Sequence, residues 1–485
     1  MERLILYLIG RALLLASGFM VIPFLYSINM GTDQTTGVLG QSILITLISG
    51  VLIRSCTARH GDSFSVSGGA AFLFALWTAL SIFGALPYYL SGLLGPVDAF
   101  MESLSGFTTT GYTCLIDLED PALILWRSMT QWIGGGMILM FIATIMPAVS
   151  GVFGISFSMP VALKTGIISL KRVKNNTRRL SIIYALITLA GILIIRLTGL
   201  DVFDAVNFSL VIISTGGCYF YDRSLYDNTW FAMALLIGLM AAGGNVIIYW
   251  QAIKRQTTSI LKKNLHNTES HIFLAIIGVG GLIIGLHLFA ANDYTFLESM
   301  KYGFFSVALY AGTISAYPME VLNWTEFDRM ILILAATVGG CIGSLAGGFK
   351  ILRLIILFKS CVNEMTRTIH PDIIMTIKID GKIVPPALIS RVLGFFFVVI
   401  MVIALSILVI SAAGLDMQQS MEIALACITS TGAIMFFHTD SATLMALPAA
   451  IKLFCCFLMV LGKLDIFALL LLIYNGRQHL LNKRW

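Results

Sequence analysis

Four short stretches of small and polar residues interrupt an otherwise apolar chain: TTTGY at residues 108–112, STGGC at 214–218, GTISA at 312–316 and TSTGA at 429–433. Each directly follows a short amphipathic run. An ion filter made of backbone carbonyl oxygens needs short extended segments of small residues, best with a glycine that can adopt the required dihedral angles. We therefore interpret the stretches as four arms of one filter. Three arms have a central glycine, and the third arm along the chain has Ser315 instead.

The composition is that of a membrane protein. Of 485 residues, 58% are hydrophobic and only 12% are charged, which is about half the charged share of a soluble domain. The mean hydropathy is +0.91. Long apolar runs fit helices rather than the alternating strands of a barrel. We expect a polytopic α-helical protein whose first apolar run is retained as a helix and is not a signal peptide.

The loop charges predict the orientation of the chain. Basic residues gather in 54–59, 164–179, 254–263, 350–367 and 477–484, and acidic residues occupy the alternate loops. Positive loops stay in the cytoplasm, and an even number of spans places both termini there. Basic residues spread over separate loops also argue against nucleic-acid binding. The ten predicted spans are 4–28, 38–54, 70–92, 124–149, 180–199, 229–251, 270–291, 327–359, 388–413 and 446–474.

The filter-like stretches belong to an internal repeat. Their centres lie at residues 111, 217, 315 and 432, so they are separated by 106, 98 and 117 residues. Before each stretch lies an apolar segment too short to cross the membrane and return, and re-entrant backbone is tolerated only inside protein. Asp98 and Asp204 both precede their glycine by 13 residues, where a carboxylate suits the positive end of a helix dipole.

These observations predict an all-α polytopic membrane protein. Two amino-terminal helices precede four helix/pore-loop/helix repeats around one pseudo-fourfold pore, giving ten spanning helices and four re-entrant pore helices. The predicted units are an amino-terminal helix pair at 1–60 and pore repeats at 61–160, 161–265, 266–385 and 386–485. The third repeat has a broken second helix.

Several separated segments carry a resemblance to a known family. They are FMESLSGFTTTGYT at 100–113, RSMTQWIGGGMI at 127–138, DVFDAVNFSLVIISTGG at 201–217, GGCIGSLAGGFKILRLIILFK at 339–359 and GKLDIFALLLL at 462–472. Together they resemble the Trk/Ktr/HKT superfamily of potassium transporters, and most closely the bacterial Trk-type membrane subunit. The resemblance implies a homodimer in the lipid of the bacterial inner membrane, with one potassium pore in each subunit. It also implies a cytoplasmic TrkA-type regulatory ring that binds ATP/ADP or NAD, while this chain itself binds no cofactor other than the potassium ion.

The resemblance also assigns filter residues. The pairs are Thr110 and Gly111, Gly216 and Gly217, Ile314 and Ser315, and Thr431 and Gly432. The family usually has glycine where this chain has Ser315, and in plant HKT relatives a serine there accompanies sodium permeation. Two alternatives follow: Ser315 adopts the glycine-like backbone conformation and potassium is still preferred, or the Cβ misaims the carbonyl and selectivity weakens.

A glycine-rich segment predicts a gate. GGCIGSLAGG at 339–348 lies inside a span of more than 30 residues, and five glycines with a serine cannot hold a straight helix there. The resemblance implies an intramembrane loop below the filter that obstructs the ion path. A glycine-rich packing face is the alternative. The residues concerned are Gly339, Gly340, Gly343, Ser344, Gly347 and Gly348.

Charged and polar residues in the spans are further candidates. Lys463 matches a family arginine that points at the pore below the filter, and an intramembrane cation suggests function. Pairing with Asp465, or snorkelling toward the lipid interface, is the alternative for this lysine. Arg127 and Gln131 are expected to be structural and to support the first filter arm by hydrogen bonds.

Other functions fit the sequence less well. The seven histidines form no paired metal motif, and neither a nucleophile elbow nor a complete phosphate-binding loop is present, so an enzyme is not expected. The second function considered is a proton- or sodium-coupled transporter with a midplane site, which needs buried ionisable residues in broken helices. The spans contain few such residues beyond Lys463 and Asp465.

Overall fold

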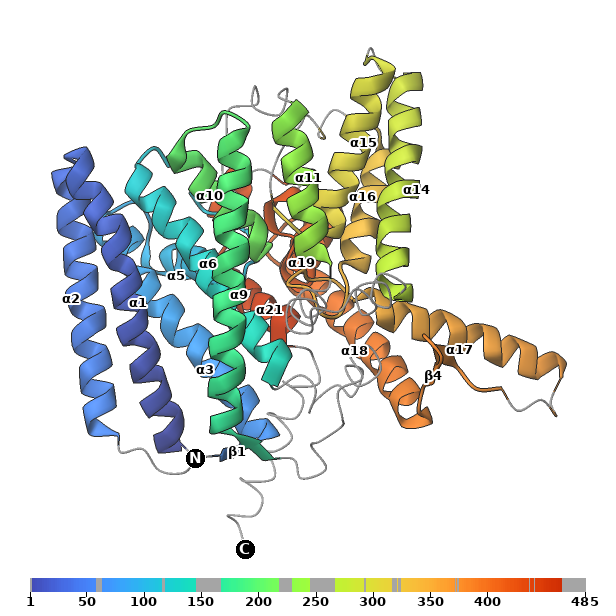
Figure 1. The fold of residues 1–485 in the computed structure, drawn as a ribbon, viewed down its shortest axis with the longest axis horizontal. Coiled ribbons are helices and arrows are strands. Elements are labelled where there is room, and N and C mark those ends of the chain that lie inside the picture. Colours follow the sequence, from blue (N-terminus) through green and yellow to red (C-terminus); the bar gives the residue numbers. More distant parts are fainter. Residues whose placement is uncertain are drawn as a thin grey trace, which may run out of the picture.

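The computed structural model places most of the chain in long helices (Figure 1). Strands are confined to two small antiparallel pairs in the part of the chain that it describes. The described residues are 2–57, 63–115, 118–144, 167–217, 229–244, 267–291, 294–315, 321, 324–370, 372, 375–435, 437–439 and 441–464.

The first two helices form an antiparallel pair at one edge of the molecule (Figure 1). Helix α1 spans Glu2–Met30 and α2 spans Asp33–Cys56. The turn between them is fixed by Ser27, whose hydroxyl lies 2.8 Å from the Thr32 hydroxyl and 2.6 Å from the Thr36 hydroxyl. Large apolar side chains such as Leu15 and Leu52 are more than half exposed on the outer surface of this pair, which suits contact with lipid.

In each of the next two repeats a short helix, α5 or α10, precedes a filter-like stretch, and the first repeat also has the five-residue helix α4. In the first repeat, Pro96 at the helix start pre-sets the backbone angle of the short helix. The helices of the first repeat are α3 (Val66–Gly84), α4 (Leu86–Leu90), α5 (Pro96–Phe107) and α6 (Pro121–Thr144). Those of the second repeat are α9 (Leu170–Leu197), α10 (Val202–Ser214) and α11 (Thr229–Gly243).

The third and fourth repeats follow the same order. In the third, Thr295 and Glu298 form a reciprocal capping box that starts the short helix. The helices of the third repeat are α14 (Thr268–Ala291), α15 (Phe296–Ala311), α16 (Glu326–Val338) and α17 (Ile351–Ile369). Those of the fourth are α18 (Pro386–Ser411), α19 (Met417–Thr429), the 3-10 turn η3 (Gly432–Met435), α20 (Ser441–Ala446) and α21 (Ala449–Leu464).

The two strand pairs lie in connections between helices. Strands β1 (Ser63–Ser65) and β2 (Ile167–Ser169) pair antiparallel, with Phe64 opposite Ile168, and join the segments that precede α3 and α9. Strands β3 (Lys378–Ile379) and β4 (Lys382–Ile383) form a tight hairpin between α17 and α18.

The fold is a polytopic α-helical membrane fold, as predicted from the sequence. Each of the ten expected spans contains helix among the described residues, and six of these helices are long and apolar enough to cross a membrane. The last parts of three expected spans, 145–149, 245–251 and 465–474, lie outside the described residues. The six helical segments are Arg3–Met30, Asp33–Cys56, Gly68–Leu90, Leu180–Leu197, Thr268–Ala291 and Pro386–Ser411.

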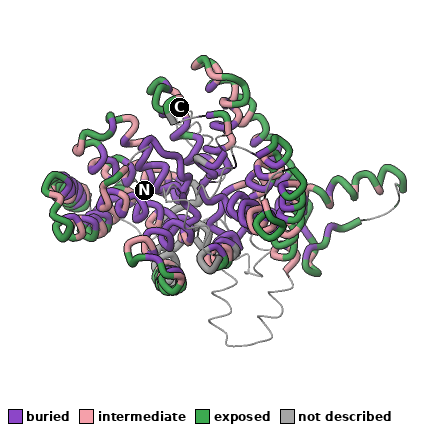
Figure 2. The backbone as a smooth tube through the Cα atoms, turned by 90° about the horizontal axis from the view of Figure 1, so that it is seen from above, coloured by how far each residue is buried: buried purple, intermediate pink, exposed green. Residues whose placement is uncertain are grey.

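The four short helices α5, α10, α15 and α19 are largely buried, whereas the outer helices are exposed along one side (Figure 2). Two tryptophans join the helices of the first repeat, one binding the end of the short helix α5 and the other joining α6 to the end of α3. Trp77 donates to the Phe107 carbonyl oxygen at 3.1 Å, and Trp126 donates to the Gly84 carbonyl oxygen at 3.0 Å. Buried indole N–H groups require such partners. The short helices are therefore held inside a shell of longer ones.

The contact between α14 and α15 depends on a glycine. A Cβ on Gly303 would collide with the Gly281 carbonyl oxygen and lie 2.7 Å from the Gly285 backbone nitrogen, whereas a Cβ on Gly278 would meet nothing within 4 Å. We expect Gly303→Ala to destabilise the protein by about 1–3 kcal/mol because rigid backbone opposes the added methyl group. Thermal unfolding of the detergent-purified protein should show a lower Tm, with Gly278→Ala as the matched control. Equal melting temperatures for the two variants would contradict the close approach.

Candidate functional site

The four short helices end in the same way. The backbone turns through a left-handed conformation at Thr109, Thr215, Thr313 and Ser430, with φ between 51° and 56°. In each arm the following residue donates its N–H to the carbonyl five residues earlier, as in a Schellman motif, at 2.9–3.1 Å. Each turn lies two residues before a predicted filter centre. The four arms therefore have equivalent backbone register, which the sequence spacing alone had suggested.

These turns are formed by residues that rarely adopt them. A β-branched threonine at positive φ is strained, and such strain persists only where the surroundings fix it. Within the described part of the chain, the hydroxyls of Thr109, Thr215 and Ser430 are buried without a hydrogen-bond partner, whereas the Thr313 hydroxyl accepts from the Gly347 N–H at 2.7 Å. The sequence pattern indicates special backbone only at the glycines and gives no sign of these four positions.

The predicted filter residues come together in one buried cluster. Gly217 and Ser315 face each other as a parallel β-bridge, and the Ser315 N–H donates to the Gly216 carbonyl oxygen at 2.8 Å. Gly432 packs so closely on the first arm that a Cβ there would lie 2.6 Å from the Gly111 carbonyl oxygen. The other members, Thr110, Ile314 and Thr431, are also fully buried.

Ser315 joins three arms through its side chain and backbone. Its hydroxyl donates to the Gly111 carbonyl oxygen at 3.1 Å and accepts from the Ile434 N–H at 3.3 Å. Ser315 does not adopt the left-handed backbone conformation of Gly111 and Gly432, which was one of the two alternatives, and the selectivity of the filter stays a prediction. Gly111 and Gly432 have φ of 74° and 57°, whereas Ser315 is not among the residues with positive φ. Its Cβ disfavours that conformation, and the residue extends alongside Gly217 instead.

Gln131 holds the second arm. From α6, its Nε2 donates to the Gly217 carbonyl oxygen at 2.6 Å, and its Oε1 accepts from the Gly217 N–H at 3.0 Å. The side chain is buried and pairs with both backbone groups of one residue, as a neighbouring strand would. The sequence analysis expected Gln131 to support the first arm. That assignment is wrong because α6 packs against α10 as well as α5.

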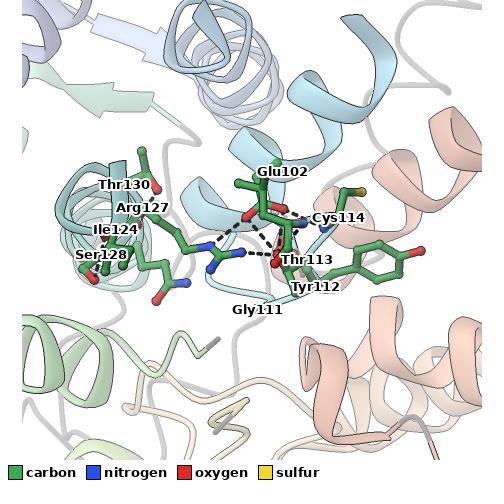
Figure 3. A network of polar contacts seen from close by, with 12 residues as sticks. Glu102, Gly111, Tyr112, Thr113, Cys114, Ile124, Arg127, Ser128 and Thr130 are labelled. Atoms are coloured by element: carbon green, nitrogen blue, oxygen red, sulfur yellow. Dashed lines mark hydrogen bonds and ion pairs between the residues drawn. The ribbon is translucent and has the colours of Figure 1, made fainter. Parts of the chain in front are cut away.

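Arg127 supports the first arm, as expected. Figure 3 shows its guanidinium extending from α6 toward Glu102 on α5, with Nε 2.8 Å from Glu102 Oε1. The carboxylate also accepts from the Cys114 N–H at 2.7 Å and from the Thr113 hydroxyl at 3.0 Å, and Arg127 donates to the same hydroxyl. The two charges are buried, with 4% and 3% exposure. Such a pair fixes the non-helical segment that leaves the first arm.

A second acidic residue supports the fourth arm. Glu422 on α19 accepts from the His438 N–H at 3.1 Å and from the Thr439 hydroxyl at 2.9 Å, and lies 2.7 Å from His438 Nδ1. The Tyr310 hydroxyl donates to the Ile434 carbonyl oxygen at 2.7 Å. Glu102 and Glu422 are supporting residues beyond those predicted from the sequence. Both are carboxylates within short apolar helices, which is the signal that could have found them.

The glycine-rich segment interrupts the helical span below the filter. Helix α16 ends at Val338 and α17 begins at Ile351, and Gly339 and Gly348 have φ of 71° and 76°. The Gly348 N–H donates to the Thr429 carbonyl oxygen at 3.0 Å. Together with the bond from Gly347 to Thr313, this contact places residues 339–348, the gate loop, against the ends of α15 and α19. Its other predicted members, Gly340, Gly343 and Ser344, are buried.

Two lysines bind carbonyl oxygens of the gate loop. Lys463 Nζ donates to Leu345 O at 3.3 Å, and Lys350 donates to Ser344 O at 3.4 Å and to Ala346 O. Lys463 is only 8% exposed, so it does not snorkel toward lipid. Asp465, its alternative partner, lies outside the described residues. Lys350, Lys463 and Arg353 line a small cavity under the loop.

This architecture defines a class of protein. Four equivalent short helices end at one central cluster of backbone carbonyls within a helical membrane fold, which is the arrangement of a cation-transporting membrane protein. The comparisons with known proteins agree with it. Residues 319–477 match the family model TrkH, described as a cation transport protein.

Full-length relatives give the family. The chain is 30% identical to the Trk system potassium uptake protein TrkH of Escherichia coli K12, over 97% of this chain and 98% of the relative. It is 27% identical to TrkG of the same organism, over 94% and 96%. The crystal structure of the potassium transporter TrkH from Vibrio parahaemolyticus matches with a TM-score of 0.85 and 25% identity, covering 97% of this chain and 98% of that one. The chain belongs to the TrkH family of cation transport proteins.

The double hydrogen bond from Gln131 gives a testable consequence. Gln131→Leu leaves the buried N–H and carbonyl of Gly217 without partners, which we expect to cost about 1–3 kcal/mol for each unsatisfied group. Gln131→Glu keeps an acceptor for the N–H but places a buried carboxylate against the Gly217 carbonyl oxygen, so its effect should be at least as large. Thermal unfolding and cation flux in proteoliposomes measure both effects. Ser128→Ala on the same helix, whose hydroxyl bonds only within α6, is the control; Gln131→Leu behaving like this control would refute the assignment.

Proposed function

We propose that this chain takes up potassium across the bacterial inner membrane by channel-like permeation through its four-armed filter. The observation that carries the proposal is the meeting of four arms with equivalent backbone register at one buried cluster. The printed names of the relatives, Trk system potassium uptake proteins, support potassium as the transported ion. The filter ligands would be backbone oxygens of Thr110, Gly111, Gly216, Gly217, Ile314, Ser315, Thr431 and Gly432.

The physical basis is replacement of the water around the ion. Carbonyl oxygens of the four arms compensate for the lost hydration, and the negative ends of four helix dipoles point at the same place. The supporting side chains, such as Gln131 and Glu102, keep the arms from closing onto one another or moving apart. Selectivity depends on this spacing because potassium and sodium differ in size and hydration.

The gate loop would control permeation. It is hydrogen-bonded to the inner ends of two arms at Thr313 and Thr429. The ammonium groups of Lys350 and Lys463 donate hydrogen bonds to its carbonyl oxygens. Positive charges directly below a cation filter repel the permeating ion. Opening therefore requires the loop and at least one of these charges to leave the path.

Partners follow from the same family membership. We infer a homodimer with one pore per subunit, controlled by a cytoplasmic TrkA-type ring that binds ATP/ADP or NAD. Helix α17 extends away from the bundle (Figure 1), and its Phe358, Met365 and Ile369 are each about 70% exposed. Apolar residues at such a position favour contact with lipid or with a second subunit. The basic loops support cytoplasmic termini.

A sodium-permeable transporter is the second candidate. The observation in its favour is that the Ser315 hydroxyl donates to the Gly111 carbonyl oxygen. This hydrogen bond occupies one of the oxygen's two lone pairs, which would otherwise be available to coordinate the ion. A filter with one ligand oxygen hydrogen-bonded in this way would prefer potassium over sodium less strongly. A cation-coupled symporter with weakened potassium selectivity would have the same filter, but its flux would require a second ion.

Growth and flux measurements test the proposal. Expression in a bacterium that lacks potassium uptake should restore growth on low potassium, and proteoliposomes should take up rubidium, a potassium substitute, down its own gradient. Proteoliposomes without protein and a Gly432→Arg variant, which blocks the fourth arm, are the controls. Sodium flux without rescue would favour the second candidate, and obligatory movement of sodium or protons would favour symport.

Ser315 gives a sharper prediction about selectivity. We expect Ser315→Gly to raise the preference for potassium over sodium by up to about tenfold, which corresponds to about 1.4 kcal/mol. Ser315→Ala keeps the Cβ but removes the hydroxyl, so it separates the two causes. Flux ratios for the two ions in proteoliposomes measure the preference. Equal ratios in the parent and Ser315→Gly would refute a role of the serine in selectivity.

A further inference from the structure

One buried carboxylate outside the filter remains to be explained. Glu269 is the second residue of α14 and is 0% exposed. Its Oε1 accepts a hydrogen bond from the backbone N–H of Ile342, in the middle of the gate loop. A carboxylate is expensive to bury, so its hydrogen bonds to backbone are strong and directional. The first turn of α14 therefore fixes the position of the gate loop.

Thr268, the residue before Glu269, is hydrogen-bonded to the β3–β4 hairpin. The backbone N–H of Thr268 donates to Asp380 Oδ1 at 3.1 Å, and its hydroxyl donates to the same oxygen at 2.5 Å. Asp380 is exposed and forms the turn of the β3–β4 hairpin, with φ of 47° followed by Gly381 at 76°. A carboxylate at the first turn of α14 also suits the positive end of the helix dipole.

The same hairpin is bound to the helix that follows the gate loop. Lys359 of α17 donates to the Lys378 carbonyl oxygen at 2.7 Å. Ile377 and Ile379, on the first strand segment of the hairpin, are buried, and the hairpin lies along α17 in Figure 1. The contacts close a ring that runs from the gate loop into α17, across the hairpin to α14, and back through Glu269 to the loop. A movement of α17 relative to α14 must break or shift one of these contacts.

We propose that Glu269 is a positioning residue that holds the gate loop closed, and that the Asp380–Thr268 contact is the latch through which the hairpin controls it. The inference rests on the proposed function, because it concerns the gate of that pore. The hairpin lies on the side of the basic loops, which is cytoplasmic by the distribution of charge. The two contacts act one after the other, from Asp380 to Thr268 and from Glu269 to the gate loop. Asp380 is exposed and Glu269 is buried, so a cytoplasmic protein can bind at the Asp380–Thr268 latch but cannot reach the gate loop directly.

Cys341 offers a direct readout of the loop. It precedes Ile342, is 0% exposed, and is a free thiol. In full-length protein reconstituted in lipid vesicles, the rate of its modification by a water-soluble maleimide reports release of the loop. Peptide mass spectrometry separates this site from the exposed Cys56 and Cys361. We expect Glu269→Ala and Asp380→Ala each to raise the labelling rate at least about fivefold, the lower end of typical coupling between sites.

Conservative variants separate positioning from general destabilisation. Glu269→Gln and Asp380→Asn keep an oxygen that accepts the same hydrogen bond, so they should label at close to the parent rate. Glu364→Ala removes a carboxylate from the exposed part of α17, where its ion pair with Arg367 is 3.8 Å long and exposed, and should also leave labelling unchanged. Rubidium flux without a regulatory protein should rise in parallel with labelling in the two alanine variants.

A double variant tests whether the two contacts act in series. Glu269→Ala combined with Asp380→Ala should label no faster than Glu269→Ala alone, since the latch acts through Glu269. Additive effects, or unchanged labelling in Asp380→Ala, would overturn the proposal. If neither the parent protein nor the two alanine variants pass rubidium, the proposed function fails, while the labelling of Cys341 still decides whether the linkage exists.

Discussion

The structure depends on one constraint, the need to satisfy backbone hydrogen bonds at depths of the membrane where water is scarce. Four short helices stop inside the bundle, and each leaves carbonyl and amide groups that no lipid can satisfy. The chain meets this need first locally, by the same turn at Thr109, Thr215, Thr313 and Ser430. It then uses side chains from neighbouring helices, of which Gln131 on Gly217 is the most complete case.

Buried carboxylates extend this support beyond the filter. Glu102 and Glu422 fix the segments that leave the first and fourth arms, and Glu269 fixes the gate loop. Each accepts a backbone N–H that would otherwise be unpaired in a non-helical segment. Breaking such a buried contact on one side leaves an uncompensated charge or amide, which is far more costly than losing an exposed pair. These carboxylates therefore make a single arrangement of the irregular segments much more favourable than the alternatives.

Much of this architecture could be predicted from the sequence, for identifiable reasons. Apolar runs give the helices, small-residue stretches give the irregular segments, and the spacing of Gly111, Gly217 and Gly432 gives the repeat. The hydrogen-bond partners of individual side chains could not be predicted in the same way. Gln131 precedes the second arm by 86 residues, and only the packing of α6 between α5 and α10 decides which arm it supports. Ser315 likewise pairs with Gly217 of the second arm, and the number of residues between them does not indicate that they are in contact.

The third arm contacts both the other arms and the glycine-rich loop. Ser315 is bonded to the first arm, the second arm and the segment after the fourth, and two residues before it Thr313 accepts from the gate loop. The loop also binds the end of the fourth arm at Thr429. A loop that moves away would release the Thr313 hydroxyl and change the environment of the strained turn that positions Ser315. Under the proposed function, these two hydrogen bonds would couple the loop to the third and fourth arms. The third arm, in which serine stands in place of the glycine, therefore contacts the loop through Thr313 and the first arm through Ser315.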